Sequence, residues 1–75
     1  MRRAGRVIGN AQGVAVLRSE AGERPDIGET VVDEHLHAVG RIVDVFGPVE
    51  QPYVAVTPIS DRSPESLLSS VLYLR

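Results

Sequence analysis

Apolar residues occur along the chain in short segments rich in valine and isoleucine, and glycine, proline or polar residues separate these segments. Short segments of this composition are typical of β-strands, and none has the length and 3.6-residue period of an amphipathic helix. We therefore predict an all-β fold with strands over residues 4–9, 14–18, 30–33, 38–46, 53–57 and 71–74.

Two predicted hairpins join these strands. The polar link 10–13 has the composition of a hairpin turn, so the first two strands are expected to be antiparallel neighbours. Residues 34–37 turn the chain into the long strand 38–46. The prolines of 47–52 end that strand, because a prolyl nitrogen cannot donate a hydrogen bond to the ladder. The polar residues 19–28, which include two glycines and one proline, form the longest predicted loop.

Near the C-terminus, Ser63, Pro64 and Glu65 predict one short helical turn, with a capping hydroxyl, a proline at the first helical position and an early acid. Six short strands without a full helix predict a small closed barrel, because an open sheet of this size would expose two unpaired edges. A chain of 75 residues is long enough for only one such domain, which we place at residues 1–75.

The long strand is apolar on both faces. Val39, Val43 and Val45 share one parity, and Ile42 and Phe46 share the other. A barrel interior takes only one of these sets, and no long helix is predicted to cover the outside, so the surplus is expected to meet another protein. The alternative is a β-bulge that swaps the parity midway along the strand.

Charge and composition narrow the range of functions. The chain carries 8 basic residues, all arginine, and 10 acidic residues, and its net charge of -2 argues against binding nucleic acid through bulk charge. Arg2, Arg3 and Arg6 form a small basic tip as an exception. The chain has no cysteine, no secretory signal and no apolar run of membrane-spanning length. We expect a cytoplasmic protein that does not enter a membrane.

No residue pattern typical of catalysis is present. The chain has two histidines and no cysteine, and its serines are concentrated near the C-terminus without a base close in sequence, so neither an active site nor a cofactor is expected. His35 and His37 lie beside acidic residues, but the segment is a predicted turn, and we predict no metal there. Asp33 and Gly40 are assigned structural roles. Asp44 lies among valines and isoleucine and is expected to be hydrogen-bonded to a nearby arginine or to backbone donors.

Three segments of the chain resemble one protein family in both order and spacing: residues 28–34 (GETVVDE), 39–49 (VGRIVDVFGPV) and 52–56 (PYVAV). The run GRIVDVFGPVEQPY over residues 40–53 is the most distinctive part. On these residues the chain resembles the small β-barrel Gar subunit of archaeal and eukaryotic H/ACA ribonucleoproteins. The close similarity covers residues 28–58 of the 75.

The resemblance implies a six-stranded barrel of the translation-factor type that binds the catalytic domain of a pseudouridine synthase and is not itself catalytic. In that family the barrel lies near the synthase loop that grips substrate RNA, and it favours substrate loading and product release in ribosomal RNA modification. It makes little direct contact with guide RNA or substrate RNA. The same particle contains a kink-turn-binding protein and a zinc-ribbon protein.

The expected contact surface for the synthase is the Gly-Pro bend and the residues beside it. Gly47 lets the chain turn. Pro48 restricts the backbone of the bend, so an apolar surface there would lose little conformational entropy when a partner binds it. Tyr53 faces outward if Val54 and Val56 fill the interior, and an outward tyrosine is a suitable interface anchor. The alternatives are a plain barrel corner and a tyrosine ring lying over neighbouring strands. The predicted partner-binding residues are Ile42, Val45, Phe46, Gly47, Pro48, Val49, Pro52 and Tyr53.

The chain departs from the family in three places. The Gly/Arg-rich flanks of eukaryotic members do not occur in this sequence, which favours an archaeal type of subunit and does not imply RNA binding by tails. Ser69 and Ser70 stand where members usually carry glycine and a basic residue, and basic residues near the long strand are reduced to His37 and Arg41. Two alternatives stay open: an independent RNA-binding barrel, and an accessory barrel of a translation factor or larger enzyme.

Overall fold

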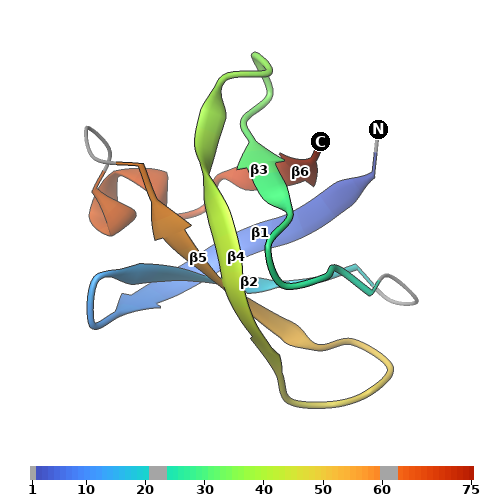
Figure 1. Ribbon diagram of the computed structural model, residues 1–75. Coiled ribbons are helices and arrows are strands. Elements are labelled where there is room, and N and C mark those ends of the chain that lie inside the picture. The colour runs from blue at the N-terminus through green and yellow to red at the C-terminus, as the bar shows by residue number, and fades with distance from the viewer. Residues whose placement is uncertain (1, 21–23, 60–62) are drawn as a thin grey trace.

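The computed structural model describes residues 2–20, 24–59 and 63–75 (Figure 1). Its elements are β1 (Arg3–Ala11), β2 (Val14–Arg18), β3 (Thr30–Val32), β4 (Ala38–Phe46), β5 (Tyr53–Pro58), the 3-10 helix η1 (Pro64–Leu67) and β6 (Val71–Leu74). The six predicted strands and the predicted helical turn are confirmed, and their ends differ from the prediction by at most two residues.

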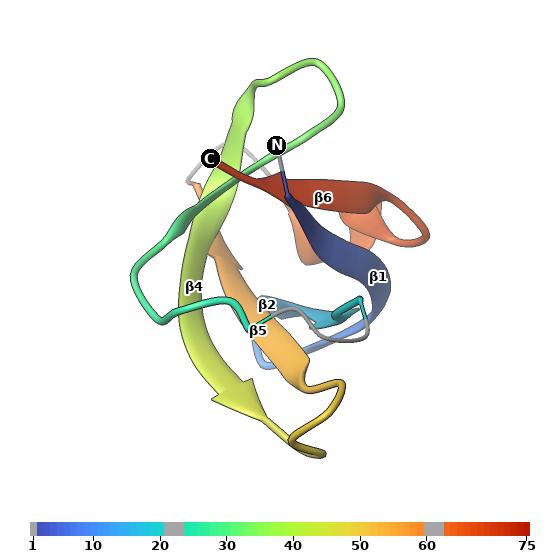
Figure 2. The same cartoon turned by 90° about the vertical axis from the view of Figure 1, so that its right-hand side faces the viewer.

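The sheet closes on itself. The strands pair in the order β1-β2-β5-β4-β3-β6, and β6 pairs back with β1, so each strand has two neighbours. All of these pairs are antiparallel, and Figure 2 shows β1 and β6 side by side where the ends of the sheet meet. The closed six-stranded antiparallel barrel confirms the predicted fold class, and closure leaves no strand as an unpaired edge.

The turn between β1 and β2 is tighter than the four-residue link predicted from the sequence. Ala11 pairs with Val14, so only Gln12 and Gly13 form the loop. Both have positive φ angles, 52° and 85° respectively. Two consecutive residues with positive φ are characteristic of a type I′ turn, whose backbone twist matches the twist of the two strands that it joins. The pairing with β2 therefore continues to Ala11, and β1 extends further than expected.

Aliphatic side chains from all six strands fill the barrel. Leu17, Ile42 and Leu72 are the largest of the fully buried ones. The helix η1 packs against β1 and β2 and adds Leu67 to this core. No helix in the described ranges has the length and apolar character needed to cross a membrane.

The start of η1 differs from the prediction in one respect. Ser63 occupies the N-cap position of η1 and Pro64 follows it as expected, but the Ser63 hydroxyl makes no capping hydrogen bond to the helix. The carbonyl oxygen of Ser63 instead accepts from the backbone N–H of Ser66 at 3.2 Å and from the Ser66 hydroxyl at 2.7 Å. The tight i to i+3 geometry of a 3-10 turn thus supplies the bond that a capping side chain would make in an α-helix.

Strand β4 contains the β-bulge that the sequence left as an alternative. Its pairing with β5 shifts between Ile42 and Asp44, so Val43 is an extra residue in the ladder. Because a bulge resets the alternation of side chains, Ile42 and Val45 both pack toward the core, whereas Val43 and Phe46 are exposed. Part of the surplus of apolar side chains that the sequence predicted for this strand therefore lies in the core, and the rest is exposed on the surface.

Candidate partner-binding site

The Gly-Pro bend connects β4 to β5 and projects from one end of the barrel (Figure 1). Phe46 is 44% exposed and Val49 is 65% exposed, and Gly47 and Pro48 between them are also exposed. This is an unusual concentration of apolar surface for a short loop, because neighbouring positions of a solvated turn are ordinarily polar. Four of the predicted contact residues therefore lie together at one accessible place.

Two other predicted contact residues are not accessible, and the structure corrects them. Ile42 is 1% exposed and belongs to the core, because the bulge at Val43 lets it and Val45 face the same way. Pro52 is buried where the bend rejoins the barrel. Neither side chain is available to a partner while the barrel is folded, so both are removed from the predicted surface. Val45 is partly buried against the core.

Two aromatic rings form the base of the bend. Val54 and Val56 do fill the interior, so Tyr53 faces outward, where it is opposite Phe46 in the ladder. The two ring centroids are 5.7 Å apart with an interplanar angle of 31°. The Tyr53 ring also covers Gly47, where a Cβ atom would lie 2.7 Å from Tyr53 Cδ2 and where φ is +90°. Glycine at this position thus serves both the turn and the close approach of the ring.

Ser19, which the sequence placed in an ordinary polar loop, directly follows β2 and holds the bend in place. Its hydroxyl donates to the Pro52 carbonyl oxygen at 2.6 Å, and its backbone N–H donates to the same oxygen at 3.1 Å. The side-chain amide of Gln51 in turn donates to the Ser19 carbonyl at 2.9 Å. Ser19 is fully buried, so the bond from its hydroxyl to the Pro52 carbonyl is protected from water. Sequence reasoning missed both residues, because a serine and a glutamine in polar segments carry no signal of a distant partner.

We expect Ser19→Ala to lower the free energy of unfolding by about 1–2 kcal/mol, because one buried hydrogen bond is lost while the Ser19 N–H still satisfies the Pro52 carbonyl. Urea unfolding followed by circular dichroism measures this change. Ser66→Ala is the matched control, since its hydroxyl bond is exposed, and a change of less than about 0.5 kcal/mol is expected there. Equal effects of the two variants would contradict the bracing role of Ser19.

Outward residues of β2, β5 and β4 continue the surface next to the bend. We call this set the β2–β5–β4 face. Its members alternate with core residues on β2 and β5, and on β4 they follow from the bulge. They are Val16, Arg18, Val43, Asp44, Phe46, Tyr53 and Ala55.

The three residues assigned structural roles have distinct surroundings. Asp44 is exposed, and its Oδ1 atom accepts from the backbone N–H of Val45 at 2.9 Å, so of the two expected kinds of partner it has a backbone donor. Asp33 Oδ1 accepts from the backbone N–H groups of His35 and His37 at 2.8 and 3.0 Å, so it organises the β3–β4 turn. Gly40 is buried, and a Cβ atom at this position of β4 would overlap the Thr57 carbonyl of β5.

The β3–β4 turn also borders a depression of about 420 Å³. Its walls include the acidic residues Asp33 and Glu34 and serines that follow η1. His35 points to solvent beside Glu34, with its Nε2 atom 3.9 Å from Glu34 Oε1. Within the described part of the chain, no group of three histidine, cysteine or carboxylate side chains is placed to hold a metal ion.

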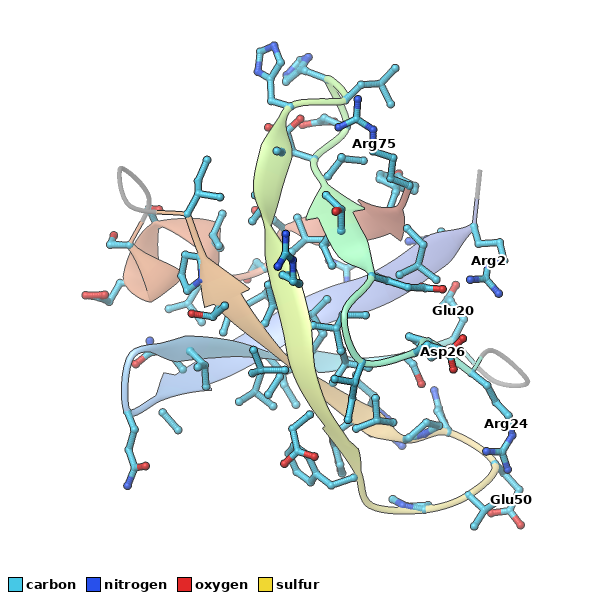
Figure 3. All side chains as sticks on the ribbon, viewed as in Figure 1. Arg2, Glu20, Arg24, Asp26, Glu50 and Arg75 are labelled. Carbon is cyan, nitrogen blue, oxygen red and sulfur yellow. The ribbon has the colours of Figure 1, made fainter. Side chains whose placement is uncertain are left out.

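The predicted basic tip is largely engaged with other groups. Arg2 pairs with Glu29 at 3.3 Å and Arg3 pairs with Glu20 at 3.4 Å. Arg6 donates to the Ser69 carbonyl oxygen at 3.3 Å. Figure 3 shows charged side chains of both signs on the side of the barrel where Arg2 lies. This side therefore lacks the single-sign character of a groove that tracks phosphates.

The chain was compared with known proteins. A scan against protein-family models finds no matching family, and a search of curated proteins finds no match. The small six-stranded antiparallel barrel is thus established by its own strand pairing.

Proposed function

We propose that this chain is a noncatalytic subunit of an H/ACA RNA-guided pseudouridylation complex, of the Gar type. In this proposal the barrel docks on the catalytic domain of the pseudouridine synthase and aids substrate loading and product release. A kink-turn-binding protein and a zinc-ribbon protein complete the particle, and RNA contacts pass mainly through the other subunits.

The observation that carries the proposal is the coincidence of two features in one segment. The run GRIVDVFGPVEQPY, which resembles the family, contains the bend where Phe46, Pro48 and Val49 are exposed. Apolar side chains exposed to water at this bend cost free energy unless another protein covers them. Buried aromatic anchors contribute much of the binding energy of protein interfaces. The hydrogen bond from Ser19 to Pro52 and the packed rings of Phe46 and Tyr53 hold the bend in one conformation, which reduces the conformational entropy lost on docking.

Complex formation tests this proposal directly. The purified chain is mixed with the pseudouridine synthase of the same organism and analysed by gel filtration with light scattering. The expected result is a one-to-one complex at micromolar concentrations, which corresponds to a binding free energy of about -8 kcal/mol or better. Separate elution of the two proteins at these concentrations would overturn the proposal.

An independent RNA-binding barrel is the second candidate, and the basic tip is the feature that favours it. The chain has only three aromatic residues for stacking, and Arg2 and Arg3 already pair with carboxylates. Titration of the isolated chain with single-stranded RNA at low salt separates the candidates. Micromolar, salt-sensitive binding supports the RNA-binding barrel, and no binding supports the subunit proposal.

A further inference from the structure

A hollow of about 410 Å³ lies on the outside of the barrel, at the end of β5 away from the Gly-Pro bend. It extends over β3, β4 and β5, and β4 is the middle strand of these three (Figure 1). Its lining combines one arginine and two threonines with a proline, an isoleucine, an alanine and a glycine. None of these residues belongs to the contact surface predicted for the synthase.

Arg41 and the two threonines form one row across the hollow. In the ladder, Arg41 pairs with Thr30 of β3 on one side and with Thr57 of β5 on the other. The next pair along β4 and β5, Ile42 and Val56, is buried in the core, so the row of Arg41 faces outward. Directly paired side chains lie about 5 Å apart. The row therefore places two hydroxyl groups beside one guanidinium group, and all three residues line the hollow.

The positive charge of Arg41 is not neutralised by any residue that the structure describes. Arg41 is exposed, and its side chain makes no hydrogen bond or ion pair with a described residue. Arg2 and Arg3 differ in this respect, because both pair with carboxylates. Among the described residues, no carboxylate lines the hollow either. The group that complements this hollow is therefore an anion.

The other walls favour a protein carboxylate over a nucleic-acid phosphate. Pro58 and Ile59 form an apolar side, and Ile59 is 41% exposed. Binding to a phosphate backbone requires several cations along its path, whereas the lining contains one arginine. A single arginine is sufficient for a carboxylate, which accepts two parallel hydrogen bonds from one guanidinium group. An acidic residue next to an aliphatic residue thus matches both the charged and the apolar side of the hollow.

We propose that this hollow binds an aspartate or glutamate side chain of a partner protein, in a segment that places an aliphatic residue against Pro58 and Ile59. The Arg41 guanidinium donates two hydrogen bonds to the carboxylate, and the hydroxyls of Thr30 and Thr57 donate to its remaining lone pairs. The hollow and the Gly-Pro bend lie at opposite ends of β5 and share no residue. Binding at the hollow therefore does not depend on the identity of the protein that covers the bend.

Titration of the isotope-labelled full chain with two blocked dipeptides, followed by NMR, tests the proposal. Acetyl-Glu-Leu-amide carries the carboxylate and the aliphatic side chain, and acetyl-Gln-Leu-amide lacks only the charge. At fixed pH and ionic strength, the glutamate peptide should shift the Arg41 Nε–H signal and the amide signals that border the hollow. The shifts should saturate with a dissociation constant on the order of 1–10 mM, and the glutamine peptide should bind at least about tenfold more weakly.

Substitutions in the row separate the hollow from a general effect of charge. Arg41→Gln should abolish saturable binding of the glutamate peptide, and Thr57→Val should weaken it about threefold through the loss of one hydroxyl donor. Arg18→Gln is the matched control. Arg18 is also exposed and has no hydrogen bond or ion pair with a described residue, but it does not line the hollow. The control should bind the peptide within about twofold of the wild-type affinity.

Inorganic phosphate is the third probe, and it represents the nucleic-acid alternative. Tighter binding of phosphate than of the glutamate peptide at the hollow would overturn the proposal in favour of a phosphate site. Equal binding of the two peptides, equal loss in Arg41→Gln and Arg18→Gln, or shifts that lie elsewhere on the barrel would overturn it also. The synthase is absent from these experiments, so their outcome and that of the subunit proposal are distinguishable.

Discussion

Gly40→Ala is expected to lower the free energy of unfolding by about 3 kcal/mol or more. Gly40 is buried in β4 and pairs with Val31 on one side and Pro58 on the other. An alanine methyl would overlap the Thr57 carbonyl oxygen and come within 2.9 Å of Val56 Cγ1. Backbone atoms of a closed barrel cannot move apart at one point without loss of ladder hydrogen bonds, so overpacking here is costly. A domain of this size has only about 4–11 kcal/mol of stability in total.

Urea unfolding at a fixed temperature measures the effect, with circular dichroism as the signal. Gly9→Ala is the matched control, because the same substitution in β1 meets no atom within 4 Å. We expect the control to change stability by less than about 0.5 kcal/mol. If Gly40→Ala and Gly9→Ala unfold at the same urea concentration, the close approach of β4 to β5 is not the reason for the glycine.

Phe46→Ala is expected to weaken binding to the pseudouridine synthase about 100-fold, while it lowers the stability of the barrel by only about 1 kcal/mol. An aromatic anchor at the centre of an interface contributes about 2–4 kcal/mol to binding when truncated. In the free barrel the same ring is 44% exposed and lies beside the Tyr53 ring on the outside of the barrel, so folding depends on it less. Pro48→Asp should act in the same direction, because a carboxylate in an apolar contact loses its hydration.

A binding titration together with a thermal melt separates docking from folding. Ile59→Ala is the control, since Ile59 is 41% exposed and lies beyond the end of β5 opposite to Tyr53. Its affinity for the synthase should stay within about threefold of the wild-type value. An equal loss of affinity in Ile59→Ala and Phe46→Ala, or a loss explained by unfolding, would remove the bend from the docking surface.

Local composition was sufficient to predict the strands. Valine-rich segments between glycine and proline became strands with almost the predicted ends, and Pro64 began the helical turn. The closed barrel could also be predicted from the sequence. Six short strands without a covering helix have few other ways to pair the backbone N–H and C=O groups of their edge strands. The bend at Gly47 and Pro48 was predictable from local composition, because glycine permits a positive φ and proline fixes its own φ.

Positions relative to the core were harder to predict from the sequence. Parity along the long strand could not decide between a surplus of apolar surface and a bulge, and the bulge at Val43 buried Ile42 while it left Asp44 exposed. The predicted contact surface included Ile42 for this reason. A bulge depends on how two strands match over their whole length, so no single residue of β4 encodes it.

The sequence by itself determined where the chain extends and where it turns, because propensity and the special backbone of glycine and proline act within a few residues. The tertiary structure alone decided which side chains face the core, that Ser19 holds Pro52, and that Arg41 lies between two threonines of neighbouring strands. Ser19 and Pro52 are 33 residues apart. Contacts at such separations form only when the barrel closes, since they depend on the register of several strands at once.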